Sequence, residues 1–381
     1  MKTFIGTAKN IRNPIICKIT AKVFDDNKKS EVLTCFSDYS SKTPLLLICG
    51  RSKDAQSEES SPIFQLHERE CSLNIGDVIL LEPSGQGTIL FDTTSTSNAV
   101  FVTERCNSRC VMCPQPPQSD RDNYVDVALK TISLLDVETD VLGITGGEPT
   151  LVWDGLMEVL RACREYIPQT TLQLLTNAKA LKDYEKAHDL VLTGGEKLMV
   201  CIPLYADISI LHDQIVGSKG AFWETLEGIH NLARLDVSIE LRNVITKMNY
   251  TRLPQWSEFV CKNLPFINHV AFIGLEPFGL ALDNLNHVWI DPLDYVAQVE
   301  QSIKILHRRN MNVSLYNHQL CTLPKKLWRF SCKSISEWKN KYFPICDQCK
   351  VSMLCGGFFD SADNIKSRGI HAITDETSYC H

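Results

Sequence analysis

Apolar residues along the chain follow two patterns, and the change between them comes near residue 98. Before this point, short runs rich in Ile, Val and Leu are separated by Gly and Asp, which favour turns. These runs are Ile15–Phe24, Leu45–Cys49, Val78–Leu81 and Thr88–Phe91. Short strands broken by turns are typical of a small barrel or sandwich. Residues 1–97 are therefore predicted to form a β-rich domain, with either a docking or a purely structural role.

From Ala99 onward, apolar runs of strand length alternate with segments whose apolar residues have helical spacing. The predicted strands are Ala99–Thr103, Val141–Thr145, Thr171–Leu175, Lys197–Leu204, Ser238–Ile245 and His269–Leu275. The predicted helices are Val125–Val137, Trp153–Tyr166, Phe222–Leu235, Leu253–Leu264 and Tyr295–His307. Repeated βα units imply a parallel sheet with helices outside it. The expected fold is α/β, with a partial (β/α)6 barrel over residues 98–311 and a cysteine-containing segment over residues 312–381.

Composition and charge are those of an ordinary globular protein. The 381 residues are 44% hydrophobic and 22% charged, with a net charge of −6 and a pI of about 6.0. A mildly acidic chain gives no electrostatic reason to expect a nucleic-acid partner. No apolar run approaches the ~18 residues that suggest a membrane span, and the N-terminus lacks the apolar core of a signal peptide. We therefore expect a cytoplasmic protein without a membrane partner.

Cysteine is unusually frequent, with 16 in the chain. In the cytoplasm cysteines remain thiols, so clustered ones favour metal binding over disulfides. Scattered cysteines among apolar residues are instead predicted to be small core residues. These are Cys17, Cys35, Cys49, Cys71, Cys163, Cys201 and Cys261.

Three clustered cysteines, Cys106, Cys110 and Cys113, have the spacing C-x3-C-x2-C. A loop of this length can bring three soft thiolate ligands onto one metal cluster. A four-iron cluster takes four cysteines, so three leave one iron without a protein ligand. An open coordination position is the mark of a catalytic metal site. The alternatives are a zinc knuckle and chance proximity.

A second motif, Gly146-Gly147-Glu148-Pro149, follows the predicted strand Val141–Thr145. Two glycines allow close backbone approach and positive φ, and the proline fixes the exit of the turn. The backbone carbonyls and the Glu148 carboxylate are expected to accept hydrogen bonds from a ligand ammonium. An ordinary turn is the alternative.

Together these motifs resemble the radical SAM superfamily, and predicted strand ends at the mouth of a barrel are where such sites lie. The resemblance implies that S-adenosylmethionine (SAM) chelates the open iron of a [4Fe-4S] cluster held by Cys106, Cys110 and Cys113. An electron from an external one-electron reductant then cleaves SAM to a 5'-deoxyadenosyl radical, which takes a substrate hydrogen. The cofactors carry the chemistry, and the protein holds and aims them.

The resemblance also implies a set of SAM contacts. The turn of residues 146–149 would contact the methionine amino group, and Met112 would lie against adenine. Thr176 and Asn177 would lie near the ribose and methionine, and Arg242 would reach the SAM carboxylate. The alternatives are ordinary packing for Met112, a helix cap or turn for Thr176 and Asn177, and a surface ion pair for Arg242.

A third cysteine group, Cys346, Cys349 and Cys355, has the spacing C-x2-C-x5-C. It resembles the auxiliary-cluster segment of SPASM and twitch domains, which implies an auxiliary [4Fe-4S] cluster. Phe358-Phe359 stands where such segments usually have another cysteine, and this favours one auxiliary cluster over two. Cys321 is the expected fourth ligand, with Cys332 and Cys380 as alternatives. A zinc site with the same thiolates is the competing interpretation.

The sequences around the motifs resemble one particular group within the superfamily. Four stretches are similar to the HxsC group of radical SAM maturases of the His-Xaa-Ser system, and they are residues 106–117, 274–277, 316–321 and 334–340. This resemblance covers roughly residues 70–360. It implies a small peptide or protein substrate with His-Xaa-Ser repeats and a partner radical SAM maturase. Two other functions stay open: radical SAM chemistry on a nucleoside or other small molecule, and zinc-dependent protein interaction without catalysis.

Overall fold

The computed structural model describes residues 2–25, 30–36, 45–49, 62–66, 73–118, 124–336, 339–362 and 365–374. The chain divides into two compact units. One comprises Met1–Val102, Asn123–Ile144 and Asp154–Thr171, and the other comprises Thr103–Asp122, Thr145–Trp153 and Leu172–His381. The three-part division at residues 97 and 311 stays a prediction. Within the described ranges, no helix has the length and apolar character needed to cross a membrane.

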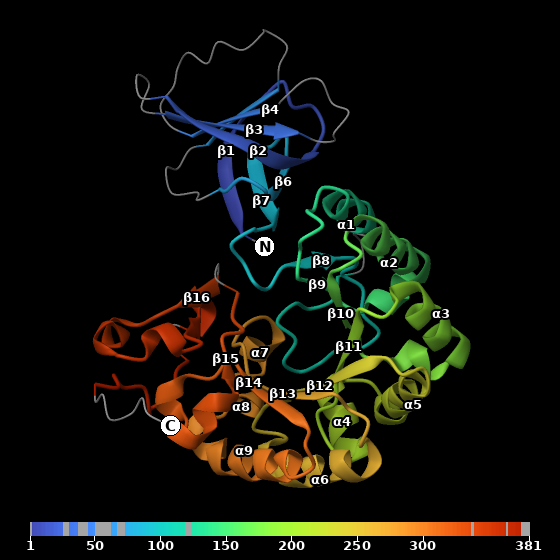
Figure 1. Ribbon diagram of the computed structural model, residues 1–381. Coiled ribbons are helices and arrows are strands. Elements are labelled where there is room, and N and C mark those ends of the chain that lie inside the picture. The colour runs from blue at the N-terminus through green and yellow to red at the C-terminus, as the bar shows by residue number, and fades with distance from the viewer. Residues whose placement is uncertain are drawn as a thin grey trace. The chain divides into compact units, whose positions relative to one another are not determined.

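The first unit contains a closed barrel with the strand order β1-β5-β4-β3-β2-β6-β7 (Figure 1). Its strands are β1 Thr3–Lys9, β2 Ile15–Asp25, β3 Ser30–Phe36, β4 Leu45–Cys49, β5 Ile63–Leu66, β6 Val78–Leu81 and β7 Gln86–Phe91. Neighbouring strands of the barrel are antiparallel except β4 and β5, which are parallel. The β-rich N-terminal region is therefore confirmed, and its form is a barrel.

Side chains along the barrel strands alternate between the interior and the outside. In β1 buried and exposed positions alternate, so Phe4 faces inward and Ile5 is 63% exposed. The barrel interior holds a cluster that includes Phe64 and the fully buried Cys17 and Cys35. These two thiols are core residues, as predicted. The side chains of Cys49 and Cys71 lie outside the described residues.

The α/β part of the chain is built on an eight-stranded sheet with the order β15-β14-β13-β12-β11-β10-β9-β8. Its strands are β8 Ala99–Phe101, β9 Val141–Thr145, β10 Thr171–Leu175, β11 Leu198–Pro203, β12 Ser238–Ile245, β13 His269–Gly274, β14 Asn312–Tyr316 and β15 Ser331–Cys332. All pairs from β10 to β15 are parallel. The predicted partial-barrel fold is confirmed, and β14 and β15 extend the sheet beyond the six predicted strands.

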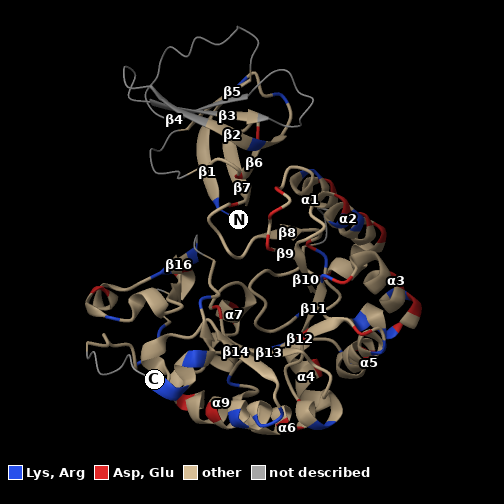
Figure 2. Ribbon diagram, viewed as in Figure 1, with Lys and Arg blue, Asp and Glu red and all other residues tan. Residues whose placement is uncertain are grey.

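Helices connect these strands. They are α1 Tyr124–Ile132, α2 Trp153–Tyr166, α3 Tyr184–Gly194, α4 Ser209–Val216, α5 Ala221–Arg234, α6 Leu253–Asn263, α7 Leu280–Asp283, α8 Leu285–Val288 and α9 Pro292–His307. In the second unit, α3, α5, α6 and α9 line the outer side of β10–β14 (Figure 1). Lysine, arginine, aspartate and glutamate are interleaved along these outer helices (Figure 2). The charged faces of the helices are therefore solvated, and the inner side of the sheet remains for a site.

The last part of the second unit has little regular structure. After β15, two short antiparallel strands, β16 Asn340–Lys341 and β17 Phe358–Phe359, are the only strand pairing among the described residues. Short helical turns at Leu320–Thr322, Pro344–Gln348 and Ser352–Leu354 carry or adjoin the C-terminal cysteines. Close packing of those turns, rather than extended secondary structure, places the cysteines.

Candidate functional site

The loop that carries Cys106, Cys110 and Cys113 is held through its backbone. We call residues 103–114 the cysteine loop. Arg109 N donates to Val216 O and Val111 N to Ile215 O, each at 2.9 Å. Leu280 N donates to Cys113 O at 2.9 Å, which ties the far end of the loop to α7. Backbone bonds from several segments of the second unit therefore define the shape of the loop.

The three thiols of the loop are free and partly buried. Burial raises the pKa of Cys106 and of Cys113, although a bond to the Ser108 backbone lowers the former and one to the Gln115 backbone lowers the latter. Burial, followed by the neighbouring Cys113 and Cys106, raises the pKa of Cys110 to about 12. All three thiols lie on eight consecutive residues, and the effect of Cys113 on Cys106 and Cys110 agrees with their being neighbours. Among the described residues, no three or more His, Cys, Asp or Glu side chains form a group able to hold one metal ion.

The Gly146–Pro149 turn bonds directly to the cysteine loop. Gly147 N donates to Thr103 O and Glu148 N to Arg105 O, each at 2.8 Å. A Cβ atom on Gly147 would lie 2.3 Å from Arg105 O, and one on Gly146 would lie 2.6 Å from Thr103 O. Neither glycine has a positive φ. Both are needed because two backbone segments touch here, rather than for an unusual conformation.

The Glu148 carboxylate is 1% exposed and is occupied by internal donors. Its Oε1 accepts from Thr150 N at 3.1 Å, and from Thr150 Oγ1 and Thr176 Oγ1 at 2.6 Å each. Its Oε2 accepts from Asn177 N at 2.7 Å. The carboxylate therefore joins the turn to the end of β10. Its expected contact with a ligand ammonium stays a prediction.

Thr176 and Asn177 lie where β10 ends, beside the cysteine loop. Asn177 Nδ2 donates to Asn107 Oδ1 at 2.7 Å. Lys179, two residues further on, reaches the same loop and donates from Nζ to Asn107 O at 2.9 Å. Sequence reasoning missed both Asn107 and Lys179. Both residues could have been found from the sequence, since Asn107 lies between Cys106 and Cys110 and Lys179 follows the predicted strand Thr171–Leu175.

Met112 is 4% exposed and packs in an apolar cluster with Ile215, Ala281 and Val288. Tyr205 and Leu275 pack against the same cluster. Ordinary packing, one of the two alternatives for Met112, is thus present in the structure, while its contact with adenine stays a prediction. The cluster keeps water away from one side of the cysteine loop.

Arg242 on β12 belongs to a buried polar network. Its Nε donates to Glu240 Oε1 at 2.5 Å, and Glu240 Oε2 lies 2.6 Å from His269 Nδ1. His269 Nε2 in turn lies 2.8 Å from Ser314 Oγ on β14. Burial alone would raise the pKa of Glu240, but the bond from His269 and the charge of Arg242 lower it to about 2. Arg242 is 22% exposed in its side chain, so the predicted surface ion pair is instead largely internal.

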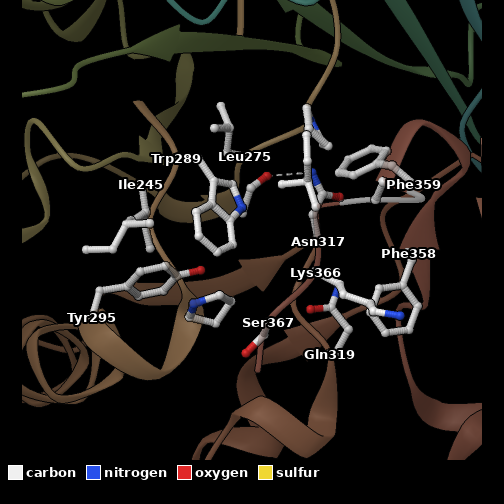
Figure 3. Close-up of a pocket in the computed structure, with 16 residues that line it drawn as sticks. Ile245, Leu275, Trp289, Tyr295, Asn317, Gln319, Phe358, Phe359, Lys366 and Ser367 are labelled. Carbon is white, nitrogen blue, oxygen red and sulfur yellow. Dashed lines mark hydrogen bonds between the residues drawn. The ribbon is translucent and has the colours of Figure 1, made fainter. Parts of the chain in front are cut away.

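A small cavity of about 50 Å³ lies at the C-terminal ends of β12, β13 and β14. Ile245, Leu275 and Asn317 stand at those strand ends, and Phe358 and Phe359 of β17 close another side. The remaining lining residues are Gly274, Pro277, Trp289, Ile290, Pro292, Tyr295, Gln319, Ala362, Ile365, Lys366 and Ser367. Figure 3 shows the Trp289 indole and the Tyr295 hydroxyl directed into the cavity. Because Leu275 also packs on the Met112 cluster, the cavity adjoins the apolar side of the cysteine loop.

Tyr295 in the wall of this cavity is paired with a buried histidine. Its hydroxyl lies 3.1 Å from His318 Nε2, and His318 Nδ1 lies 2.8 Å from Tyr316 O. Burial lowers the pKa of His318 to about 4, so the ring is neutral near pH 7. A neutral ring that donates from Nδ1 to the carbonyl accepts a hydrogen bond at Nε2 from the Tyr295 hydroxyl. The pair fixes the direction of the Tyr295 hydroxyl.

We call Cys321, Cys346, Cys349 and Cys355 the C-terminal cysteine group. Cys349 N donates to Cys346 O at 3.0 Å, and Cys349 packs against the apolar cluster that contains Cys355 and Leu320, the neighbour of Cys321. Burial, followed by Cys355 and Cys346, raises the pKa of Cys321 to about 11. Burial also raises the pKa of Cys346, with Cys355 and Cys349 adding to it. Cys332 lies on β15 and its Sγ points to Phe330 O at 3.8 Å. Cys380 lies outside the described residues.

Comparison with known proteins supports a radical SAM domain. Residues 100–256 match the family model described as the radical SAM superfamily. A GTP 3',8-cyclase of Helicobacter pylori is 31% identical over 54% of this chain and 64% of its own length. A GTP 3',8-cyclase of Campylobacter jejuni subsp. doylei is 26% identical over 48% of this chain and 58% of its own length. The chain thus spans between 46% and 64% of the first curated relatives that it matches.

Solved structures give a weaker likeness. The crystal structure of Streptococcus suis SuiB bound to S-adenosylmethionine aligns with a TM-score of 0.46 and 17% identity. That alignment covers 57% of this chain and 49% of the other.

Proposed function

We propose that this chain, which carries a radical SAM domain at residues 100–256, cleaves S-adenosylmethionine reductively and modifies a peptide or protein substrate. One observation carries the proposal. The Gly146–Pro149 turn is bonded to the cysteine loop at two points, Gly147 N to Thr103 O and Glu148 N to Arg105 O. These bonds place a backbone turn suited to a methionine amino group beside three cysteines suited to iron.

The donors of the cysteine loop fit a four-iron cluster with one open position. Cys106, Cys110 and Cys113 are free, partly buried and mutually close, and thiolates are the ordinary ligands of such clusters. Cluster ligands bind separate irons, so they need not converge on one point as the ligands of a single ion do. When bound, the cluster and SAM supply an electron and a radical that removes a hydrogen atom from the substrate.

The chain's own residues would position SAM and exclude water. Gly146, Gly147 and Pro149 form the turn for the amino group, and Glu148 holds it in place through Thr176 and Asn177. Met112 closes the apolar side toward adenine. Arg242, fixed by Glu240, would meet the SAM carboxylate from inside the sheet.

An auxiliary [4Fe-4S] cluster in the C-terminal cysteine group is part of the proposal. Cys355 and Cys346 raise the pKa of Cys321, and Cys355 and Cys349 raise the pKa of Cys346, which supports four thiols near one another. Leu320, the neighbour of Cys321, packs in one apolar cluster with Cys355 and Cys349, and this favours Cys321 as the fourth ligand. Apolar packing by Leu320, Val351 and Trp328 would shield the cluster from water.

The cavity at the strand ends is the proposed place for a substrate side chain. At about 50 Å³ it is far smaller than the roughly 300–1,000 Å³ of sites that enclose a drug-sized ligand. Its wall of Trp289, Tyr295 and Phe358 with a few polar groups suits one side chain of a longer peptide. The resemblance to the His-Xaa-Ser maturases extends the proposal to a substrate with such repeats, a partner radical SAM maturase and an external one-electron reductant.

A nucleotide substrate is the second candidate function. It is favoured by the curated relatives, which are named GTP 3',8-cyclase and are 26–31% identical over part of this chain. A zinc-binding protein without catalysis is the remaining alternative, and metal analysis of anaerobically purified protein distinguishes it.

The test of the function is formation of 5'-deoxyadenosine from SAM by reduced, iron-loaded protein. We expect turnover with the native chain and less than about one hundredth of it when Cys106, Cys110 and Cys113 are all replaced by alanine. Cys261→Ala is the matched control, because Cys261 lies on α6, away from both cysteine groups in sequence. Equal yields from the native chain and the triple variant would contradict the function.

The substrate is tested separately by deuterium transfer into 5'-deoxyadenosine. The candidates are deuterated GTP and a deuterated small protein with His-Xaa-Ser repeats, ideally one encoded next to this chain. Transfer from the small protein supports the peptide proposal, and transfer from GTP alone supports the second candidate.

A further inference from the structure

Lys179 is a buried lysine whose hydrogen-bond partners among the described residues are all uncharged. It is 8% exposed. Its Nζ donates to Asn107 O and Ser218 Oγ at 2.9 Å each, and lies 3.5 Å from Ser108 Oγ. Among the described residues it forms no ion pair with a carboxylate. A charged group is rarely buried unless an opposite charge compensates it, because burial removes its hydration.

The ammonium lies against the cysteine loop. Asn107 and Ser108, two of its three partners, stand between Cys106 and Cys110. Burial raises the pKa of both thiols, and the charge of Lys179 acts in the opposite direction on each. The lysine is therefore close enough to influence negative charge on two of the proposed ligands.

Other charged groups near the loop already have partners of their own. Glu148 accepts four hydrogen bonds from Thr150, Thr176 and Asn177. Asp213 accepts from the backbone N–H groups of Gly220 and Phe222. Burial lowers the pKa of His212 to about 4, so that ring is neutral. None of these three groups supplies the missing opposite charge through a direct contact.

We infer that Lys179 is the electrostatic partner of the iron–sulfur cluster and that it makes the cluster easier to reduce. The inference rests on the proposed function. A cluster with three thiolate ligands is an anion, and reduction adds one more negative charge. A fixed cation behind the loop stabilises the reduced form more than the oxidised form, because attraction grows with charge in a poorly solvated site. Lys179 is thus a positioning and tuning residue, not a ligand.

A purely structural role is the alternative that the experiment must separate. Lys179 also links the loop to Ser218, so its loss could simply loosen the loop. Both roles allow weaker cluster binding in a variant. Only the electrostatic role predicts a change in reduction potential in variants that retain the cluster.

The test is a potentiometric titration of iron-loaded protein, followed by electron paramagnetic resonance. The spectral component that changes on addition of SAM reports the cluster of the cysteine loop. For Lys179→Met, we expect the ratio of reduced to oxidised cluster at the native midpoint potential to fall about tenfold, a negative shift of about 59 mV for one electron. Ser218→Ala removes one hydrogen bond and keeps the charge, so it should change the ratio less than twofold.

Two further variants complete the test. Lys182→Met removes a nearby lysine that is 49% exposed in its side chain and paired with Glu224, and it should leave the ratio unchanged. Ser218→Asp keeps Lys179 but places a carboxylate beside it, so it should also lower the ratio. If Lys179→Met holds no cluster, Ser218→Asp decides the question.

A native midpoint in a cluster-loaded Lys179→Met variant, or in Ser218→Asp when that one decides, would overturn the inference and leave the proposed function intact. A native protein with no four-iron cluster would instead overturn the proposed function.

Discussion

The cysteine loop and the C-terminal cysteine group hold thiols by different means. The loop supplies three thiols from eight consecutive residues, and backbone bonds from Gly147, Leu280 and the end of α4 fix its shape. The C-terminal cysteine group gathers four thiols from residues spread over Cys321–Cys355, with apolar packing as the main support. Three ligands leave a position open and four close it, which is the difference between a catalytic and a structural metal site.

The surroundings of the two groups differ in the same sense. The buried charged residues Glu148 and Lys179 flank the cysteine loop. The Arg242–Glu240 pair lies on β12 of the eight-stranded sheet. Around the C-terminal cysteine group, Leu320, Val351 and Trp328 supply the contacts. Charged groups are costly to bury, so the buried Glu148 and Lys179 favour a polar ligand at the cysteine loop.

The largest expected effect comes from removing the open site. With two clusters, native protein should hold about eight irons per chain, and the variant with alanine at Cys106, Cys110 and Cys113 should hold about four. This variant should also lose SAM cleavage entirely, because no iron remains to bind SAM. Iron and sulfide assays give the count. Full iron content in the triple variant would place the clusters elsewhere.

Removing the C-terminal cysteine group should affect substrate modification rather than SAM cleavage. Cys346→Ala with Cys349→Ala should also reduce iron to about four per chain. SAM cleavage should persist within about fivefold, while substrate modification is lost, because the remaining cluster is the one that meets SAM. Cys321→Ala should match the double variant in iron content, and Cys332→Ala should match the native chain. If Cys332→Ala lost iron and Cys321→Ala did not, Cys332 rather than Cys321 would be the fourth ligand.

The polar network of Glu240, Arg242 and His269 predicts a dependence of stability on acid. The pKa of Glu240 is about 2 when folded, below the ~4.3 of an unfolded glutamate, so its contribution is complete above about pH 5 and is lost as pH falls toward 2. The difference corresponds to about 3 kcal/mol. Urea unfolding of native and Glu240→Gln protein between pH 5 and pH 2 measures it. We expect a flatter profile for the variant; parallel profiles would exclude this role.

A smaller effect is expected at the turn beside the cysteine loop. Glu148→Gln places an amide N–H₂ group among the donors of Thr150, Thr176 and Asn177, which should cost about 1–3 kcal/mol in unfolding free energy. SAM binding should weaken as the turn moves. Glu185→Gln on the exposed face of α3 is the matched control. Unchanged stability would show that the carboxylate does not hold the turn.

Much of the fold could be predicted because periodicity is local. The bounds of β9, β10, β12 and α2 agree with the sequence prediction. Helices α3 and α4 were not predicted from the sequence. Strand β15 was not predicted because two residues are too few to show a periodic pattern, and β14 pairs with β13 as one further parallel strand after α9.

The candidate site was only partly predictable. The cysteines and the glycine turn could be predicted from their spacing, because the residues of each motif are close in sequence. The roles of Glu148, Lys179 and the Arg242–Glu240–His269 network depend on which segments meet in space, and no local pattern records that. Gly147 illustrates the limit: its motif was recognised, but its reason, the Arg105 carbonyl, appears only in the fold.

The open iron of the cysteine loop is tested most directly by the electron paramagnetic resonance spectrum of the reduced protein before and after addition of SAM. The account predicts that one spectral component changes on addition of SAM and that this component is absent when Cys106, Cys110 and Cys113 are alanine. A spectrum that SAM leaves unchanged in the native protein would contradict it.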